Sequence, residues 1–155
     1  SKFEGRMYCG AGTVLTMEQV DMAAEVGAQF IVSPNVKREV IQETIRKEMV
    51  SMPGAMTATE AVEAAEYGAD FVKIFPAANL GAAYIKAIRS PINHIPLLAV
   101  GGVNEKNIAQ FMKAGASGVG VGGDLVNPKW IAGGEFEKIK ETAEALVQSI
   151  GGKKE

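Results

Sequence analysis

The stretch GADFVKIFP, residues 68–76, joins the end of a helix to a strand and places one lysine within an apolar run. Glycine is favoured just after a helix because it accepts the left-handed conformation, and the residues that follow suit a buried strand. The same joint occurs at GAQFIV, residues 27–32, and at GASGVG, residues 115–120, so the spacings are 41 and 47 residues. Each spacing is long enough for about two helix-plus-strand units. The joints therefore predict a chain in which helices and strands alternate.

Further signals fill the gaps between these joints. Residues 48–52 and 96–100 are predicted to form strands. Thr16 with Gln19, and Thr57 with Glu60, fit the capping box that opens a helix, and Asn104 is predicted to be the N-cap of another. Residues 135–150 are predicted to form a closing amphipathic helix. Its expected apolar stripe comprises Phe136, Ile139, Ala143, Leu146 and Val147.

Short apolar strands with intervening helices indicate a parallel sheet covered on both faces, either an open doubly wound sheet or a closed barrel. The barrel is favoured because no strand is followed by a Rossmann-type G-x-G-x-x-G that opens a helix, and because polar or special residues end many of the strands. These strand-end residues are Thr13, Pro34, Thr57, Lys73, Gly101 and Gly122. We therefore expect an α/β fold, a (β/α) TIM-type barrel, with residues 1–150 as one domain and 151–155 as a frayed tail.

Composition excludes several classes of partner. The 155 residues carry a net charge of -2, so no basic field attracts nucleic acid or anionic lipid. No apolar run reaches the roughly 20 residues of a membrane span, and the polar start Ser1–Gly5 lacks a signal-peptide core. We expect a soluble cytoplasmic protein without nucleic-acid or membrane partners.

Cysteine and histidine usage argues against disulfide and metal chemistry. The chain has one cysteine, Cys9, and one histidine, His94, so it can form neither an internal disulfide nor a Cys/His zinc cluster. We therefore expect no metal and no cofactor. Cys9 is interpreted as a small strand side chain and His94 as a solvated loop residue. Six methionines are expected to fill the core. They are Met17, Met22, Met49, Met52, Met56 and Met112.

Lys73 is the candidate chemical centre. In a strand, Phe71, Lys73 and Phe75 share one face, while Val72 and Ile74 share the other. Desolvation between aromatic rings would lower the lysine pKa from about 10.4 towards roughly 7 to 8, where the neutral amine attacks a carbonyl. The alternative is a snorkelling lysine whose stem covers apolar neighbours while its head stays in water.

Two glycine pairs end the last two predicted strands, Gly101–Gly102 and Gly122–Gly123. Barrel enzymes often bind phosphate at this place through backbone amides. Each pair alone is compatible with a tight turn. Together, on adjacent strands, they favour a site for phosphate or carboxylate.

Five motifs follow one another in an order that resembles a known family. They are Gly10–Thr16 (GAGTVLT), Phe30–Pro34 (FIVSP), Met52–Thr57 (MPGAMT), Val72–Ala77 (VKIFPA) and Gly101–Val103 (GGV). The chain resembles, over nearly its whole length, the class I aldolases that cleave 2-keto-3-deoxy-6-phosphogluconate and 4-hydroxy-2-oxoglutarate.

The resemblance implies a role for each matching residue. Lys73 would form a Schiff base with pyruvate or the keto acid, Thr13 would contact the carboxylate, and Pro34 and Phe75 would line the pyruvate pocket. The candidates for substrate binding also include Thr57, and the distal phosphate or carboxylate would be held by Gly101, Gly102, Gly122 and Gly123.

The chain also departs from the family pattern. Its first motif resembles the third strand of the family, so we expect about six of the eight strand–helix units. Nothing in Ser1–Tyr8 matches the second strand, which supplies a catalytic glutamate and an arginine, and the glutamate role is assigned to no residue here. Asp124 stands where many relatives have a serine-containing turn. It either opposes a dianion, which favours a non-phosphorylated substrate, or caps a helix beginning near Leu125.

These inferences predict a Schiff-base aldolase that releases pyruvate and an aldehyde from a small keto acid, and the resemblance implies a homotrimer. A second hypothesis is a catalytically impaired fragment that acts only as a binding or oligomerisation module. A third is a phosphosugar isomerase or synthase of similar barrel plan, which would use the glycine pairs and leave Lys73 structural.

Overall fold

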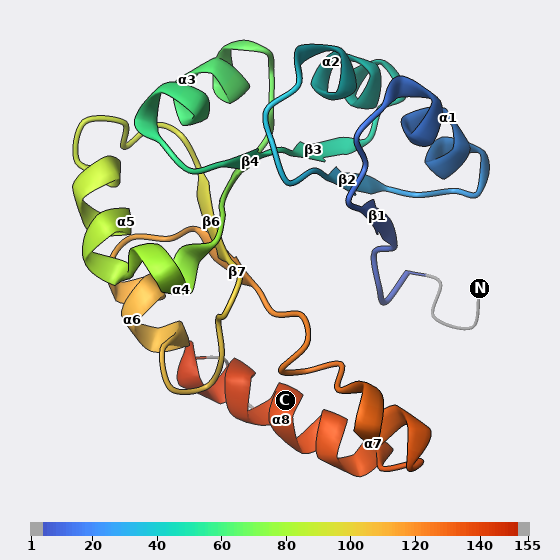
Figure 1. Ribbon diagram of the computed structural model, residues 1–155, viewed down its shortest axis with the longest axis vertical. Helices are drawn as coiled ribbons and strands as arrows, with labels where there is room; N and C mark the ends of the chain where they lie inside the picture. Colours follow the sequence, from blue (N-terminus) through green and yellow to red (C-terminus); the bar gives the residue numbers. More distant parts are fainter. Residues whose placement is uncertain (1–4, 152–155) are drawn as a thin grey trace. The chain divides into compact units, whose positions relative to one another are not determined.

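The computed structural model describes residues 5–151, over which helices and strands alternate as the joints predict (Figure 1). The strands are β1 (Gly10–Gly12), β2 (Phe30–Val32), β3 (Val50–Met52), β4 (Gly54–Ala55), β5 (Val72–Ile74), β6 (Leu97–Val100) and β7 (Gly118–Gly120). The helices are α1 (Met17–Glu25), α2 (Arg38–Arg46), α3 (Ala58–Glu66), α4 (Ala77–Leu80), α5 (Ala82–Arg89), α6 (Ile108–Lys113), α7 (Pro128–Ala132) and α8 (Phe136–Ser149). Pro53 separates β3 from β4 because proline has no N–H to donate.

The chain divides into two compact units, and the boundary falls within β5. The N-terminal unit runs to Lys73 and includes Ile92–Pro96, whereas the C-terminal unit comprises Ile74–Pro91 and the chain from Leu97 onward. Lys73 therefore belongs to the N-terminal unit, and both predicted glycine pairs belong to the C-terminal unit.

The N-terminal unit contains a parallel sheet in the order β1-β2-β3. Its register places Gly10, Phe30 and Val50 in one row, and α1 and α2 pack against each other beside these strands (Figure 1). Each large aliphatic side chain buried here contributes about 1.5 to 3 kcal/mol. The buried cluster consists of Val14, Val20, Ala23, Ile31, Val40 and Met49.

The C-terminal unit is built on the parallel pair β6 and β7, in which Leu98 faces Gly118 and Val100 faces Gly120. Helix α6 packs on β7, on α5 and on α8, and α7 packs on α8. The buried side chains include Ile108 and Phe111 of α6. No helix within residues 5–151 is long and apolar enough to cross a membrane.

The three predicted joints are confirmed by backbone geometry. Gly27, Gly68 and Gly115 all have positive φ, at 81°, 99° and 99°. At the first joint, the Gly27 N–H donates to the Ala24 carbonyl and the Ala28 N–H to the Ala23 carbonyl, both at 3.0 Å, which is the double closure of a Schellman motif. Equivalent pairs of bonds close the other two joints.

A fourth joint of the same kind lies at Glu48, which carries no glycine signal. Glu48 has a φ of 57°, and its N–H donates to the Ile45 carbonyl at 2.8 Å while the Met49 N–H donates to Thr44 at 3.1 Å. The strand predicted from residue 48 therefore begins at Val50 instead, because a left-handed residue cannot continue into the ladder.

Helix starts follow the sequence in part. Thr57 and Glu60 form the full capping box, but the Gln19 side chain accepts from the Leu15 N–H at 2.7 Å rather than from Thr16. The prediction that Asn104 is an N-cap is wrong, because α6 begins at Ile108 and its N-cap is Asn107. Asn104 instead opens the preceding turn, where its side chain accepts from the Lys106 N–H at 3.0 Å.

Several burial predictions are wrong. In α8, Leu146 is buried, but Phe136 and Val147 of the predicted stripe are 62% and 50% exposed. Three predicted core methionines, Met17, Met22 and Met56, are exposed because they lie on outward faces of the N-terminal unit, whereas Met49 is buried.

The predictions for Cys9, for His94 and for the chain ends have mixed outcomes. Cys9 is exposed and precedes β1, so its interpretation as a strand residue is wrong, whereas His94 is exposed as predicted. Within the predicted tail, Gly151 is exposed, and residues 152–155 lie outside the described residues, as do the first four residues of the unmatched start.

Candidate active site

Lys73 occupies the centre of β5, and the predicted alternation is confirmed. Val72 and Ile74 are completely buried, whereas Lys73 is half-buried on the other face. This burial lowers the pKa of the Lys73 ammonium from the ordinary value of 10.5. A lysine with a lowered pKa presents more neutral amine near physiological pH, which is the form that attacks a carbonyl.

Strand β5 is held by main-chain bonds on both sides of Lys73 within the N-terminal unit. The Lys73 N–H donates to the Pro53 carbonyl at 2.8 Å, and the Val72 N–H donates to the Pro96 carbonyl at 2.9 Å. The backbone that carries the amine is therefore fixed from two neighbouring segments.

Thr13 follows β1 in an unusual backbone conformation. It is one of two described non-glycine residues with positive φ, at 61°, and it is exposed. A β-branched residue in this region is a conformational outlier that costs of order 1 to 3 kcal/mol, and such outliers cluster at active sites. The strain supports Thr13 as a ligand-contacting residue at the end of its strand.

Thr57 caps α3 with its hydroxyl group. The hydroxyl accepts from the Glu60 N–H at 3.3 Å and donates to the Glu60 carboxylate at 2.7 Å. Hydrogen bonds from Thr57 and from the Met56 and Thr57 N–H groups lower the pKa of Glu60. The hydroxyl proton is thus already engaged, which gives Thr57 a structural task besides its predicted contact with substrate.

In the C-terminal unit, the Gly101–Gly102 turn packs tightly onto the segment that begins at Phe75. Both glycines have positive φ, at 94° and 70°. A Cβ on Gly101 would lie 2.9 Å from the Phe75 ring, and one on Gly102 would lie 2.5 Å from the Ala78 Cβ. The structure therefore brings Gly101, which was predicted at the distal anion site, next to Phe75, which was predicted in the pyruvate pocket.

The carbonyl groups of this turn are engaged by the protein. The Gly101 carbonyl accepts from the Ala78 N–H, and the Gly102 carbonyl accepts from the Asn107 side chain, both at 2.9 Å. The Asn107 side chain also accepts from the Asn104 N–H at 2.9 Å. Sequence analysis missed Asn107, although the repeat of asparagine three residues after Asn104 was an available signal.

Gly122 and Gly123 lie in an open, exposed turn where an added Cβ would meet nothing within 4 Å. The Gly122 carbonyl closes this turn by accepting from the Leu125 and Val126 N–H groups, each at 2.9 Å. The two glycine pairs thus differ, because Gly101 and Gly102 have no room for a side chain whereas Gly122 and Gly123 do.

The prediction that Asp124 caps a helix near Leu125 is wrong. Helix α7 begins at Pro128, and its N-cap is Asn127, whose side chain accepts from the Lys129 N–H at 3.0 Å. Proline is well suited to the first helical position but disfavours helical geometry in the preceding residue, so a helix cannot run through from Leu125.

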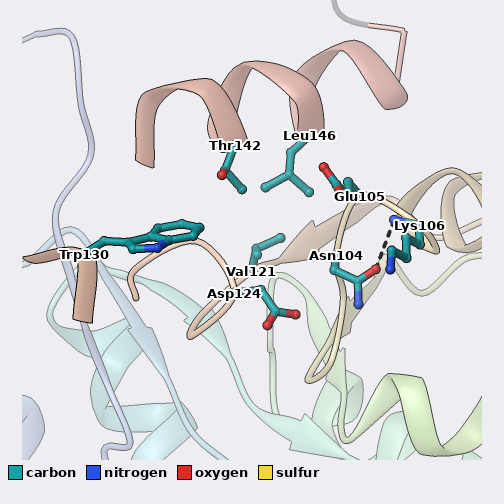
Figure 2. A pocket seen from close by; sticks show the side chains of 8 residues that line it. All are labelled: Asn104, Glu105, Lys106, Val121, Asp124, Trp130, Thr142 and Leu146. Atoms are coloured by element: carbon teal, nitrogen blue, oxygen red, sulfur yellow. Dashed lines mark hydrogen bonds between the residues drawn. The ribbon is translucent and has the colours of Figure 1, made fainter. Parts of the chain in front are cut away.

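Asp124 instead lines a pocket of about 280 Å³ within the C-terminal unit (Figure 2). Figure 2 shows Trp130 at one end of the pocket, Lys106 at the other, and Leu146 of α8 above Val121. Within residues 5–151, no group of three or more His, Cys, Asp or Glu side chains could hold a metal ion.

Comparison with known proteins gives the family. The sequence profile of the KDPG and KHG aldolases matches residues 3–142. The chain belongs to this family. A 2-dehydro-3-deoxy-6-phosphogalactonate aldolase of Escherichia coli (strain K12) is 45% identical over 141 residues, which cover 90% of this chain and 67% of the relative. The chain is thus an aldolase of the KDPG type that spans about two thirds of the length of this relative.

Solved structures of the family agree. The structure described as native KDPGal has a TM-score of 0.89 at 42% identity, covering 96% of this chain and 70% of that one. The KDPG aldolase of Legionella pneumophila, with pyruvate captured as a covalent carbinolamine, has a TM-score of 0.85 at 29% identity, covering 94% and 70%. The expected TIM-type α/β fold is confirmed by this likeness and by the alternation of parallel strands with helices.

Proposed function

We propose that this KDPG-type aldolase is a class I enzyme in which Lys73 forms a Schiff base with the keto group of its substrate. The observation that carries the proposal is the half-buried position of Lys73 on β5, whose pKa burial lowers. The Legionella relative, described with pyruvate captured as a carbinolamine, supports the same chemistry by similarity.

The reaction follows from the electron demand of an iminium ion. The neutral Lys73 amine adds to the keto carbon to give a carbinolamine, which loses water to form the iminium. The aldol carbon–carbon bond then breaks, its electron pair forms an enamine, and the hydroxyl proton passes to a base as the aldehyde leaves. Protonation of the enamine and addition of water release pyruvate and regenerate Lys73.

Thr13, Pro34, Thr57 and Phe75 are proposed to surround the keto-acid end of the substrate. Thr13 would donate to the carboxylate, while Pro34 and Phe75 would exclude water from the imine. The distal phosphate or carboxylate would be bound by amides of Gly101, Gly102, Gly122 and Gly123. The tight seat of Gly101–Gly102 supports this role, because its carbonyls are engaged by protein donors and anions are bound by N–H groups.

The substrates proposed are 2-keto-3-deoxy-6-phosphogluconate and 4-hydroxy-2-oxoglutarate. The name of the Escherichia coli relative adds the 6-phosphogalactonate isomer to this set. Cleavage of each compound, coupled to pyruvate detection, would rank them. A phosphate-binding site predicts a much lower KM for the two phosphorylated sugar acids than for 4-hydroxy-2-oxoglutarate.

Borohydride reduction in the presence of pyruvate tests the Schiff base directly. Peptide mass spectrometry should find a lactyl-sized mass increase on the peptide that contains Lys73. If Lys73→Ala is labelled as strongly as the unchanged protein, Lys73 is not the nucleophile.

The alternative, a binding or oligomerisation module, is favoured by one observation. Met22 of α1 and Val26, the C-cap residue of that helix, are 66% and 85% exposed, and an exposed apolar pair of this kind suits a protein interface. Light scattering beside the cleavage assay separates the hypotheses, because oligomers without turnover would support the module.

We also propose that residues 1–150 form one barrel domain and that the enzyme is a homotrimer.

A further inference from the structure

Gly54, at the start of β4, lacks room for a side chain. An added Cβ would lie 2.5 Å from the Pro34 carbonyl carbon, closer still to its oxygen, and 2.8 Å from the Ser33 carbonyl oxygen. The φ of Gly54 is not positive, so glycine is required here because there is no space for a side chain and not because of the backbone conformation. Both neighbours belong to the segment that ends β2 in the same N-terminal unit.

The strand register places Gly54 beside Lys73. In the β1-β2-β3 sheet, the Val50 N–H donates to the Gln29 carbonyl, and the residue paired with Val50 is Phe30, which follows the acceptor. The Lys73 N–H donates to the Pro53 carbonyl, so by the same rule Lys73 pairs with Gly54. Paired residues direct their Cβ positions to the same face of a sheet. The missing side chain of Gly54 therefore lies on the face that carries the Lys73 amine.

We propose that Gly54 is a positioning residue for the keto-acid pocket: its lack of a side chain lets the Ser33–Pro34 backbone close onto β4 in the row that holds Lys73. This inference rests on the proposed Schiff-base role of Lys73 and on Pro34 as a wall of that pocket.

The contact is demanding because its partners are main-chain atoms. A side chain can rotate away from an added methyl group, but the Ser33–Pro34 carbonyls can move only if the end of β2 moves with them. Displacement of Pro34 would open the row beside Lys73 to water. Burial lowers the pKa of Lys73, so added water should raise that pKa towards 10.5 and reduce the fraction of neutral amine.

Two glycines of β1, which belongs to the three-stranded sheet of the same unit, provide matched controls. At Gly12 an added Cβ would meet nothing within 4 Å, so Gly12→Ala adds a methyl group without a clash. At Gly10 the Cβ would lie 2.5 Å from Cγ of the Phe30 ring, so Gly10→Ala crowds a side chain instead of the backbone. Gly10 pairs with Phe30, which in turn pairs with Val50, and this row does not contain Lys73.

The experiment measures the rate of borohydride trapping with pyruvate as a function of pH in the unchanged chain and in Gly54→Ala, Gly12→Ala and Gly10→Ala. Gly54→Ala should trap roughly 10- to 100-fold more slowly at neutral pH, with its midpoint moved to higher pH. Gly12→Ala and Gly10→Ala should keep the midpoint of the unchanged chain, even if Gly10→Ala lowers the melting temperature. A shift of the midpoint distinguishes positioning of Lys73 from a general loss of stability.

Two outcomes would overturn the proposal. One is a folded Gly54→Ala protein whose trapping rate and midpoint equal those of the unchanged chain. The other concerns Pro34→Ala, which leaves Gly54 in place and is measured if Gly54→Ala does not fold. The proposal expects Pro34→Ala to slow trapping, and an unchanged trapping rate would show that Pro34 does not line the pocket. Failure of the proposed function looks different, because the unchanged chain itself would then acquire no pyruvate label on Lys73.

Discussion

The two units of this aldolase provide their candidate residues in different ways. In the N-terminal unit, Lys73 and Thr13 would act through side chains, and the key property is the environment of one amine, whose pKa burial lowers. In the C-terminal unit, Gly101 and Gly102 would act through backbone amides, held by the Ala78 N–H and the Asn107 side chain. A side-chain function depends on the residue itself, whereas a backbone function depends on the neighbours that shape the turn. Variants that change the side-chain groups and the backbone groups separately would test this difference.

The largest effect is expected for Lys73→Met. Removal of the amine leaves no nucleophile for the keto carbon, so pyruvate trapping and aldol cleavage should fall to background. Lys86→Met changes an exposed lysine of α5 and should retain both activities. Trapping and cleavage are measured on the same samples, and residual cleavage by Lys73→Met without a label would assign the reaction to another mechanism.

Gly102→Ala should affect the distal end of the substrate and spare the amine. The new methyl group meets the Ala78 Cβ and is forced into a positive φ of 70°, so the turn must rearrange. We expect KM for a phosphorylated substrate to rise about tenfold, equivalent to roughly 1.4 kcal/mol of binding, with trapping of pyruvate unchanged.

Gly134→Ala is the control for Gly102→Ala, because Gly134 has a φ of 69° with open space around it. Steady-state cleavage kinetics and trapping rates are compared for both variants. An equal loss of pyruvate trapping in Gly102→Ala would mean that the side-chain and backbone groups do not act separately.

Thr57→Ala should cost about 1 kcal/mol of stability, because the capping hydroxyl and its bond to Glu60 are lost together. Thr57→Ser keeps the hydroxyl and should restore most of that loss. Thr16→Ala removes a single cap bond from α1 and should cost less. Urea unfolding measures all three, and a change in pyruvate KM for Thr57→Ser would show that the threonine methyl group contacts substrate.

The smallest effect is a pH dependence of stability. Because the pKa of Lys73 is lowered in the folded chain, the unfolded chain binds more protons between that lowered value and 10.5. The free energy of unfolding should therefore rise with pH through this window, relative to Lys73→Met, which lacks the buried ammonium. The comparison uses urea titrations from neutral pH to pH 10.5, and parallel curves for the two proteins would contradict the lowered pKa.

Much of the local structure could be predicted because it depends on short-range backbone chemistry. The Gly27, Gly68 and Gly115 joints and the capping box of Thr57 need only residues a few positions apart, and all were predicted. Glu48 forms the same joint without a glycine, so the start of the strand was predicted at residue 48 instead of at Val50.

The same distinction between short-range and long-range effects applies to the candidate site residues. Strand alternation alone predicts that the Lys73 side chain lies on the face opposite Val72 and Ile74. The engagement of the Gly102 carbonyl by Asn107 could not be predicted, because it depends on how the turn after β6 folds back before α6. Met22 was expected in the core, yet hydrophobicity gives a preference for burial and does not specify which helix face is covered.

The sequence by itself determined the alternation of helices and strands, the family, and the lysine in an apolar strand, since each is encoded in residues that lie close together in the chain. The tertiary structure alone decided that Gly54 must lack a side chain, that Asn127 and not Asp124 caps α7, and that Lys73 is half-buried. The physical reason is that steric exclusion and desolvation depend on distances between segments, and Gly54 meets Pro34 only after β2 and β4 have come together.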